Sequence, residues 1–120
     1  MAWSPGQARA CYDRLRKRYF MDGQGITPPL GKELRWVWLP VGSPFRGAVL
    51  FDQEGHPHTL ELNMGLLEWP GLLRTTLLHE LTHIRLGPTY ACPSETRNSR
   101  VPAAWKKEAI RLAALGAPLL

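Results

Sequence analysis

Two histidines and a glutamate stand close together in the stretch 75–87, TTLLHELTHIRLG. On an α-helix, residues four positions apart lie on one face, so His79 and His83 can direct imidazole nitrogens at a single ion. Glu80 is turned about 100° around the helix axis, which keeps it out of that ligand set but within reach of a water on the ion. This arrangement suits zinc-dependent hydrolysis, in which two neutral ligands hold Zn²⁺ and the carboxylate takes a proton from the attacking water.

An ordinary amphipathic helix is the alternative, because a bare HExxH pattern also arises by chance. Apolar residues surround the motif: Leu77, Leu78, Leu81 and Ile84. They indicate a helix that is largely buried. Burying two histidines and a glutamate without partners would cost several kcal/mol, and a metal ion with its water removes that cost. We therefore predict a Zn²⁺ site on this helix, with Glu80 as the catalytic base.

A catalytic zinc site usually takes three protein ligands, and no histidine follows His83. The final predicted helix offers Glu108, in the middle of an apolar stripe on which we expect no Lys or Arg. The other members of this stripe are Val101, Trp105, Leu112 and Leu115. Glu108 is the predicted third ligand, with Glu95 and then Cys92 as the alternatives. A partly exposed Glu108 on an imperfect amphipathic helix is the other interpretation.

Three further residues have side chains that could bind metal or stabilise an oxyanion, but we expect them to have structural or solvent-facing roles. His56 and His58 lie in or beside a turn and are expected to face solvent rather than bind metal. Tyr90 could stabilise an oxyanion, although packing or anchoring of its loop is the expected role.

The elements that position these residues follow from the pattern along the chain. Ser4 and Pro5 open a helix that runs to about residue 20, and the Gly- and Pro-rich stretch 22–33 is a loop. Strands are predicted at 34–40, 46–51 and 58–64, then the motif helix at 72–86, a polar loop at 87–101 and a final helix at 102–116. This order indicates a small α+β domain with a three-stranded sheet.

The bulk properties fit one domain that spans residues 1–120 and has a hydrophobic core. The chain is 44% hydrophobic and 21% charged, and no apolar run approaches the roughly 18 residues of a membrane span. No secretory signal is expected, because the first 20 residues lack a continuous apolar region. Two cysteines, Cys11 and Cys92, do not form a disulfide framework, so we predict a cytoplasmic location and no membrane partner.

The net charge of +5 favours contact with phosphate backbones or acidic partners without specifying them. An Arg-rich, Leu- and Pro-rich composition could produce the same excess for other reasons. The residues that could form a phosphate-facing patch are Arg14, Lys17, Arg97, Arg100, Lys106 and Lys107. Nucleic-acid contact is therefore an open alternative, and the sequence does not indicate an oligomeric state.

The stretch TLLHELTHIRLG, followed by PAAWKKEAIRLAALGAP, resembles the SprT-like metallopeptidases. That resemblance implies a third histidine ligand four residues before an aromatic residue that corresponds to Trp105. The counterpart here is Val101, which cannot bind metal. The tail EAIRLAAL is also similar to the glutamate-bearing helix of the ImmA/IrrE-like and minimal gluzincin peptidases, which implies Glu108 as the third ligand. Zincins also align substrate along an edge strand, and 58–64 is the predicted edge strand.

The favoured interpretation is a zinc metalloprotease that acts on a protein or peptide, with His79, His83 and Glu108 as ligands and Glu80 as base. One alternative is an inactive or weakly active peptidase-derived module that binds DNA or DNA-bound protein, which the departure at Val101 keeps open. A second is an SprT-like protease that acts on DNA-associated proteins.

Overall fold

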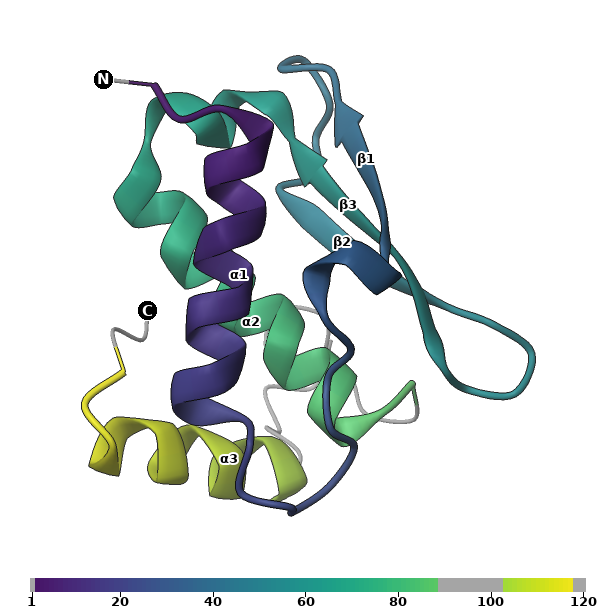
Figure 1. Cartoon of the computed structure of the whole chain (residues 1–120), viewed down its shortest axis with the longest axis vertical. Coiled ribbons are helices and arrows are strands. Elements are labelled where there is room, and N and C mark those ends of the chain that lie inside the picture. The colour runs from purple at the N-terminus through teal and green to yellow at the C-terminus, as the bar shows by residue number, and fades with distance from the viewer. Residues whose placement is uncertain (1, 89–102, 118–120) are drawn as a thin grey trace.

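The computed structural model describes residues 2–88 and 103–117. Helix α1 (Pro5–Tyr19) is followed by strands β1 (Arg35–Leu39), β2 (Gly47–Phe51) and β3 (Pro57–Asn63), then by helices α2 (Pro70–Leu86) and α3 (Ala103–Ala114). In Figure 1 the helices lie together beside the sheet, with α3 crossing near one end of α1. The predicted α+β class and the predicted element order are confirmed.

The sheet has the strand order β1-β3-β2, with β1 parallel to β3 and β2 antiparallel to β3. The prediction that 58–64 forms an edge strand is therefore wrong. A hairpin places β2 on one side of β3, and the parallel pairing of β1 occupies the other side (Figure 1). Among the described strands, β1 and β2 carry the open edges.

Helix α1 begins after Ser4, as the sequence predicted, and the structure shows that Ser4 and Gln7 cap it reciprocally. The Ser4 hydroxyl accepts from the Gln7 backbone N–H at 3.2 Å, and the Gln7 side chain accepts from the Ser4 backbone N–H at 2.8 Å. Pro5 occupies the first turn, where its missing N–H costs nothing. The buried face of α1 is formed by Ala8, Cys11, Tyr12, Leu15 and Tyr19. These residues belong to the core that α1 shares with α2.

Helix α2 begins at Pro70, two residues before the predicted start, and ends where Gly87 takes a positive φ of 85°. A residue with a Cβ is strained at that angle, so glycine ends the helix cleanly. The expectation of a largely buried helix is confirmed. Its buried apolar residues are Leu73, Leu77, Leu78, Leu81 and Ile84. This burial fixes the rotation of α2, and hence the directions in which the motif residues point.

Helix α3 buries Trp105, Glu108 and Leu112, in agreement with the predicted stripe. Leu115 departs from it, with 49% of its surface exposed, because the helix ends at Ala114 and Leu115 lies in the following turn. Val101 is outside the described residues. No helix in the described part of the chain is long and apolar enough to span a bilayer.

Candidate metal centre

His79, Glu80 and His83 lie together on α2 and could hold a metal ion. One candidate ligand atom from each residue can be chosen so that all lie within 4.8 Å of one another. The two imidazole ring centres are 4.9 Å apart, and a Glu80 carboxylate oxygen lies 4.0 Å from Nε2 of His79. The three residues predicted from the i, i+1, i+4 spacing are therefore brought into one cluster.

These residues fit a divalent ion by both geometry and chemistry. Two atoms bound to one zinc lie at most about 4.2 Å apart, because each Zn–N bond is about 2.1 Å long. The observed spread needs at most a small side-chain rotation to meet that limit. Imidazole nitrogen and carboxylate oxygen are both ligand types that suit zinc and related divalent metals.

The exposure of the three residues differs in a way that matters for hydrolysis. The Glu80 side chain is 3% exposed, whereas the His79 side chain is 33% exposed. A substrate can therefore approach His79 from solvent, while Glu80 is shielded from bulk water. A shielded carboxylate beside a partly exposed histidine would suit a base that acts on one water held by a metal ion.

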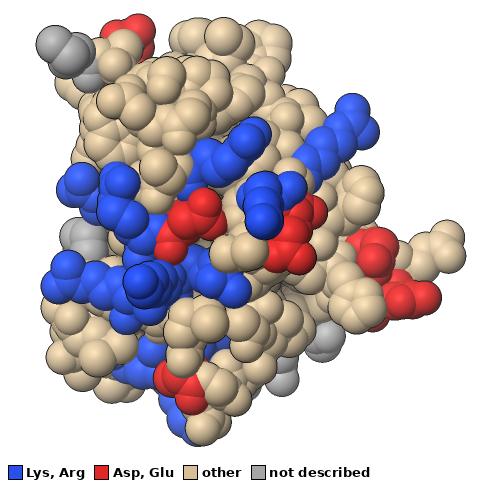
Figure 2. Space-filling view, viewed as in Figure 1, with Lys and Arg blue, Asp and Glu red and all other residues tan. Residues whose placement is uncertain are grey.

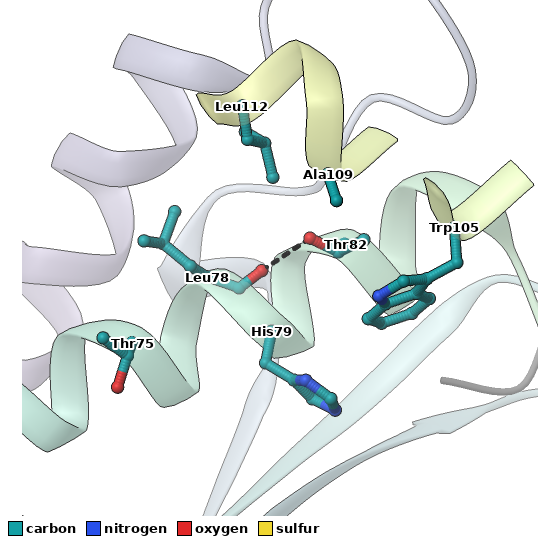
Figure 3. Close-up of a pocket in the computed structure, with 7 residues that line it drawn as sticks. All are labelled: Thr75, Leu78, His79, Thr82, Trp105, Ala109 and Leu112. Carbon is teal, nitrogen blue, oxygen red and sulfur yellow. Dashed lines mark hydrogen bonds between the residues drawn. The ribbon is translucent and has the colours of Figure 1, made fainter. Parts of the chain in front are cut away.

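Trp105 from α3 contacts both imidazoles. Its ring centre lies 5.2 Å from that of His79 and 4.9 Å from that of His83. Figure 3 shows the indole reaching from α3 toward His79 on α2. Trp105 is 8% exposed, so it covers one side of the histidine pair and restricts the orientations of both rings.

A cavity of about 110 Å³ opens beside His79, between α2 and α3. Leu78 and Leu112 contribute apolar walls, and Thr82 turns its hydroxyl away to donate to the Leu78 carbonyl at 2.8 Å (Figure 3). With that hydroxyl satisfied within its own helix, the cavity presents mainly hydrocarbon. It is of the order of the roughly 150 Å³ apolar cavity that binds benzene, so a small apolar group fits it.

Glu108 is buried, with 5% of its surface exposed, but it has two cationic partners. Nε of Arg85 lies 3.0 Å from one carboxylate oxygen, and Arg111 donates to the other through Nε at 3.0 Å and through Nη2. The expectation that no Lys or Arg shares the face of Glu108 is therefore wrong. Arg111 lies one turn along α3, and Arg85 reaches across from α2. The role of Glu108 as a metal ligand stays a prediction.

Asp22 extends this ion-pair network to the loop after α1. Its carboxylate accepts from Nη2 of Arg85 at 2.7 Å and lies 3.5 Å from Nη1 of Arg111. The hydrogen bond from Arg85 is the main cause that lowers the pKa of Asp22 to about 2, so this side chain is ionised at neutral pH. The network of Asp22, Arg85, Glu108 and Arg111 fixes α3 against α2.

The remaining predicted residues divide between exposed positions and positions outside the described residues. His56, between β2 and β3, and His58, the second residue of β3, are both exposed as expected, and neither belongs to the metal-capable cluster. Tyr90, Cys92 and Glu95 lie outside the described residues, so their roles stay predictions. Sequence reasoning missed Arg85 and the contact of Trp105 with both histidines. The i, i+3 spacing of Glu108 and Arg111 could have revealed that pair.

Comparisons of the chain with protein-family models, with curated proteins and with solved structures found no match. The case for function therefore depends on the residues themselves. The structure contains an HExxH-type cluster on α2 that could hold a metal ion, within an α+β fold.

Proposed function

We propose that this chain is a zinc-dependent metallopeptidase with its centre at His79, Glu80 and His83. The observation that carries the proposal is the convergence of the three side chains on one buried helix, with Glu80 shielded and His79 open to solvent. The resemblances to SprT-like and gluzincin-type peptidases rest on this motif and on the final helix, and they support the same reaction class.

Each residue has a distinct part in the proposed reaction. His79 and His83 would hold the ion through neutral imidazole nitrogens, and Trp105 restricts their orientations. When bound, Zn²⁺ supplies Lewis-acid activation of a water molecule and of the peptide carbonyl. Glu80 accepts the proton of the attacking water and delivers it to the leaving amine. Its burial excludes competing water from that transfer.

The predicted substrate-aligning strand, β3, is central and has no open edge. Strand β2 has an open edge and is suited to hold an extended substrate. Gly47, the first residue of β2, lies so close to α2 that an added Cβ would be 3.4 Å from Cγ2 of Thr76. Thr76 is one turn before Glu80 on α2. A peptide that pairs with the β2 edge would therefore run alongside α2 and past His79.

Cleavage of unfolded casein tests the proposal directly. Protein loaded with zinc is expected to produce new N-termini over time, and a chelator should stop the reaction until zinc is restored. Mass spectrometry of the products separates peptide-bond hydrolysis from loss of protein by precipitation. Cleavage that continues at the same rate after complete metal removal would contradict the proposal.

The identity of the third zinc ligand has its own test. If Glu108 binds zinc, as the sequence predicts, Glu108→Gln should weaken zinc binding sharply. Glu95→Gln should then leave zinc binding nearly unchanged. If Glu108 instead serves only its ion pairs with Arg85 and Arg111, Glu108→Gln should leave zinc binding nearly unchanged, because those guanidinium groups already satisfy the carboxylate. Competition with a chromogenic chelator measures both affinities. A zinc affinity that Glu95→Gln lowers and Glu108→Gln does not would rule out the glutamate of α3.

Contact with nucleic acid is a second candidate function, favoured by the distribution of charge. On the face that Figure 2 draws, several Lys and Arg side chains lie close together, with Asp and Glu side chains among them. Arg14 and Lys17 are exposed on α1, and Lys106 and Lys107 are exposed on α3. Arg97 and Arg100 of the predicted patch lie outside the described residues.

This second function predicts DNA binding that weakens steeply with salt. Each phosphate neutralised by a basic side chain releases counterions, so affinity should fall as salt rises from about 50 to 200 mM. Fluorescence anisotropy of labelled single- and double-stranded DNA measures it, with Arg14→Glu/Lys17→Glu as the charge-reversed variant. If wild type fails to bind at about 50 mM salt, the excess charge has no role in nucleic-acid contact.

A further inference from the structure

An open groove of about 300 Å³ lies at the N-terminal end of α2, apart from the histidine cluster. Its walls include Phe45, Trp69 and Leu72, with Arg46 at the side. Phe45 is 66% exposed and Trp69 is 68% exposed. Large aromatic side chains that expose so much surface around one groove are typical of a site that binds an apolar group.

The groove is preformed because a single amide holds its wall. The Nδ2 of Asn63 lies 3.2 to 3.3 Å from the backbone carbonyl oxygens of Pro40, Val41, Ser43 and Phe45, and its two N–H groups are shared among these four acceptors. These contacts pin the loop between β1 and β2 to the end of β3. Because this wall is ordered before a ligand binds, binding would cost little conformational entropy.

Helix α2 links the groove to the proposed centre, because it contributes Leu72 to the groove and His79 to the centre. Leu72 and His79 are seven residues apart, which is about two helical turns, so they lie on the same side of the helix about 10 Å apart. β2 starts at Gly47, directly after Arg46, and passes α2 beside Thr76. An extended peptide rises about 3.3 Å per residue, so about three residues span this distance.

Arg46 adds a charge preference to the groove, beside its aromatic and aliphatic walls. Its side chain is exposed, and among the described residues it forms no ion pair with Asp or Glu. An acidic group next to the bound apolar side chain would give Arg46 an ion-pair partner at the groove margin. The groove therefore complements an apolar residue with an acidic neighbour.

We propose that this groove selects substrates by binding an aromatic or aliphatic side chain about three residues from the cleaved bond, next to an acidic residue. The inference rests on the proposed peptidase function. Phe45, Trp69 and Leu72 bind the apolar side chain, and Arg46 pairs with the acidic one. The substrate class is then an unfolded or extended polypeptide with an acidic-aromatic pair, read at a fixed distance from the point of cleavage.

Binding to the zinc-loaded Glu80→Gln protein tests the groove without requiring catalysis. The probes are short labelled synthetic peptides that differ only in having Phe or Ala at one position, and Asp or Lys beside it. Fluorescence anisotropy should show roughly ten-fold weaker binding when Phe is replaced by Ala. Phe45→Ala/Trp69→Ala should remove the preference for Phe, and Arg46→Glu should reverse the preference for Asp. Ile110→Ala, which removes an apolar side chain that is 71% exposed on α3, is the matched control and should change neither.

A second arm maps the cleaved bond in the same peptides with the active protein. Mass spectrometry should place the cut about three residues from Phe, and Phe45→Ala/Trp69→Ala should abolish that fixed distance. Equal binding of the Phe and Ala peptides, or a preference that survives the groove variants, would overturn the groove proposal. Selective binding without any cleavage would support the groove and contradict the peptidase function.

Discussion

Glu80→Gln is expected to lower the rate of peptide-bond hydrolysis by about 10²–10⁴-fold, the usual effect of losing a general base. The amide keeps the shape of the buried side chain but cannot accept the proton of the attacking water. Zinc content should stay at the wild-type level, because the proposed site uses Glu80 as the base and the neighbouring His79 and His83 as ligands. Measuring casein cleavage and bound zinc on the same samples separates these two effects.

The matched control for this variant is Glu68→Gln, which makes the same chemical change at an exposed position before α2. It should cleave at the wild-type rate. Equal cleavage by wild type and Glu80→Gln at matched zinc content would show that Glu80 is not the base. Loss of zinc from Glu80→Gln would instead show that Glu80 is itself a ligand.

Arg85→Ala is expected to lower the free energy of unfolding by about 3–5 kcal/mol, the range for breaking a buried ion pair. The Arg85 side chain is 3% exposed and that of Glu108 is 6% exposed, so removing the cation leaves the Glu108 carboxylate short of a partner in the interior. Native domains are stable by only about 5–15 kcal/mol, so this variant should be close to unfolding. Urea denaturation followed by circular dichroism measures the change.

Two comparisons distinguish the ion pair from simple loss of packing. Arg111→Ala should cost less than Arg85→Ala, because the Arg111 side chain is 23% exposed and solvent already screens its ion pairs. The double variant Arg85→Met/Glu108→Met removes both charges and should be more stable than Arg85→Ala alone. If Arg85→Ala cost less than about 1 kcal/mol, the typical net contribution of one ordinary hydrogen bond, the network would not hold α3 in place.

Local patterns predicted much of this fold because they depend on neighbours in sequence. Ser4 and Pro5 start α1 as predicted, and α2 ends before Gly87. The three strands also lie where aromatic, β-branched and alternating residues predicted them. The cluster of His79, Glu80 and His83 belongs to the same category, since the helical repeat alone brings these side chains together.

Features that depend on contacts distant in sequence could not be predicted in this way. The central position of β3 follows from a parallel pairing with β1, which no local pattern specifies. The pairing of Arg85 with both Asp22 and Glu108 joins three separate segments. The prediction for Glu108 identified a buried carboxylate correctly. It missed both cations, Arg111 one turn along the same helix and Arg85 from α2, and only the second depends on a contact distant in sequence.

Elemental analysis of the protein purified without added metal tests the central claim most directly. Inductively coupled plasma mass spectrometry of wild type is expected to find a single zinc ion per chain, and His79→Ala/His83→Ala should lose it. His56→Ala/His58→Ala, which removes the two exposed histidines of the β2–β3 hairpin, is the matched control and should keep it. Absence of zinc from wild type even after incubation with zinc salt, or retention of zinc by the His79→Ala/His83→Ala variant, would contradict the claim that α2 carries a zinc centre.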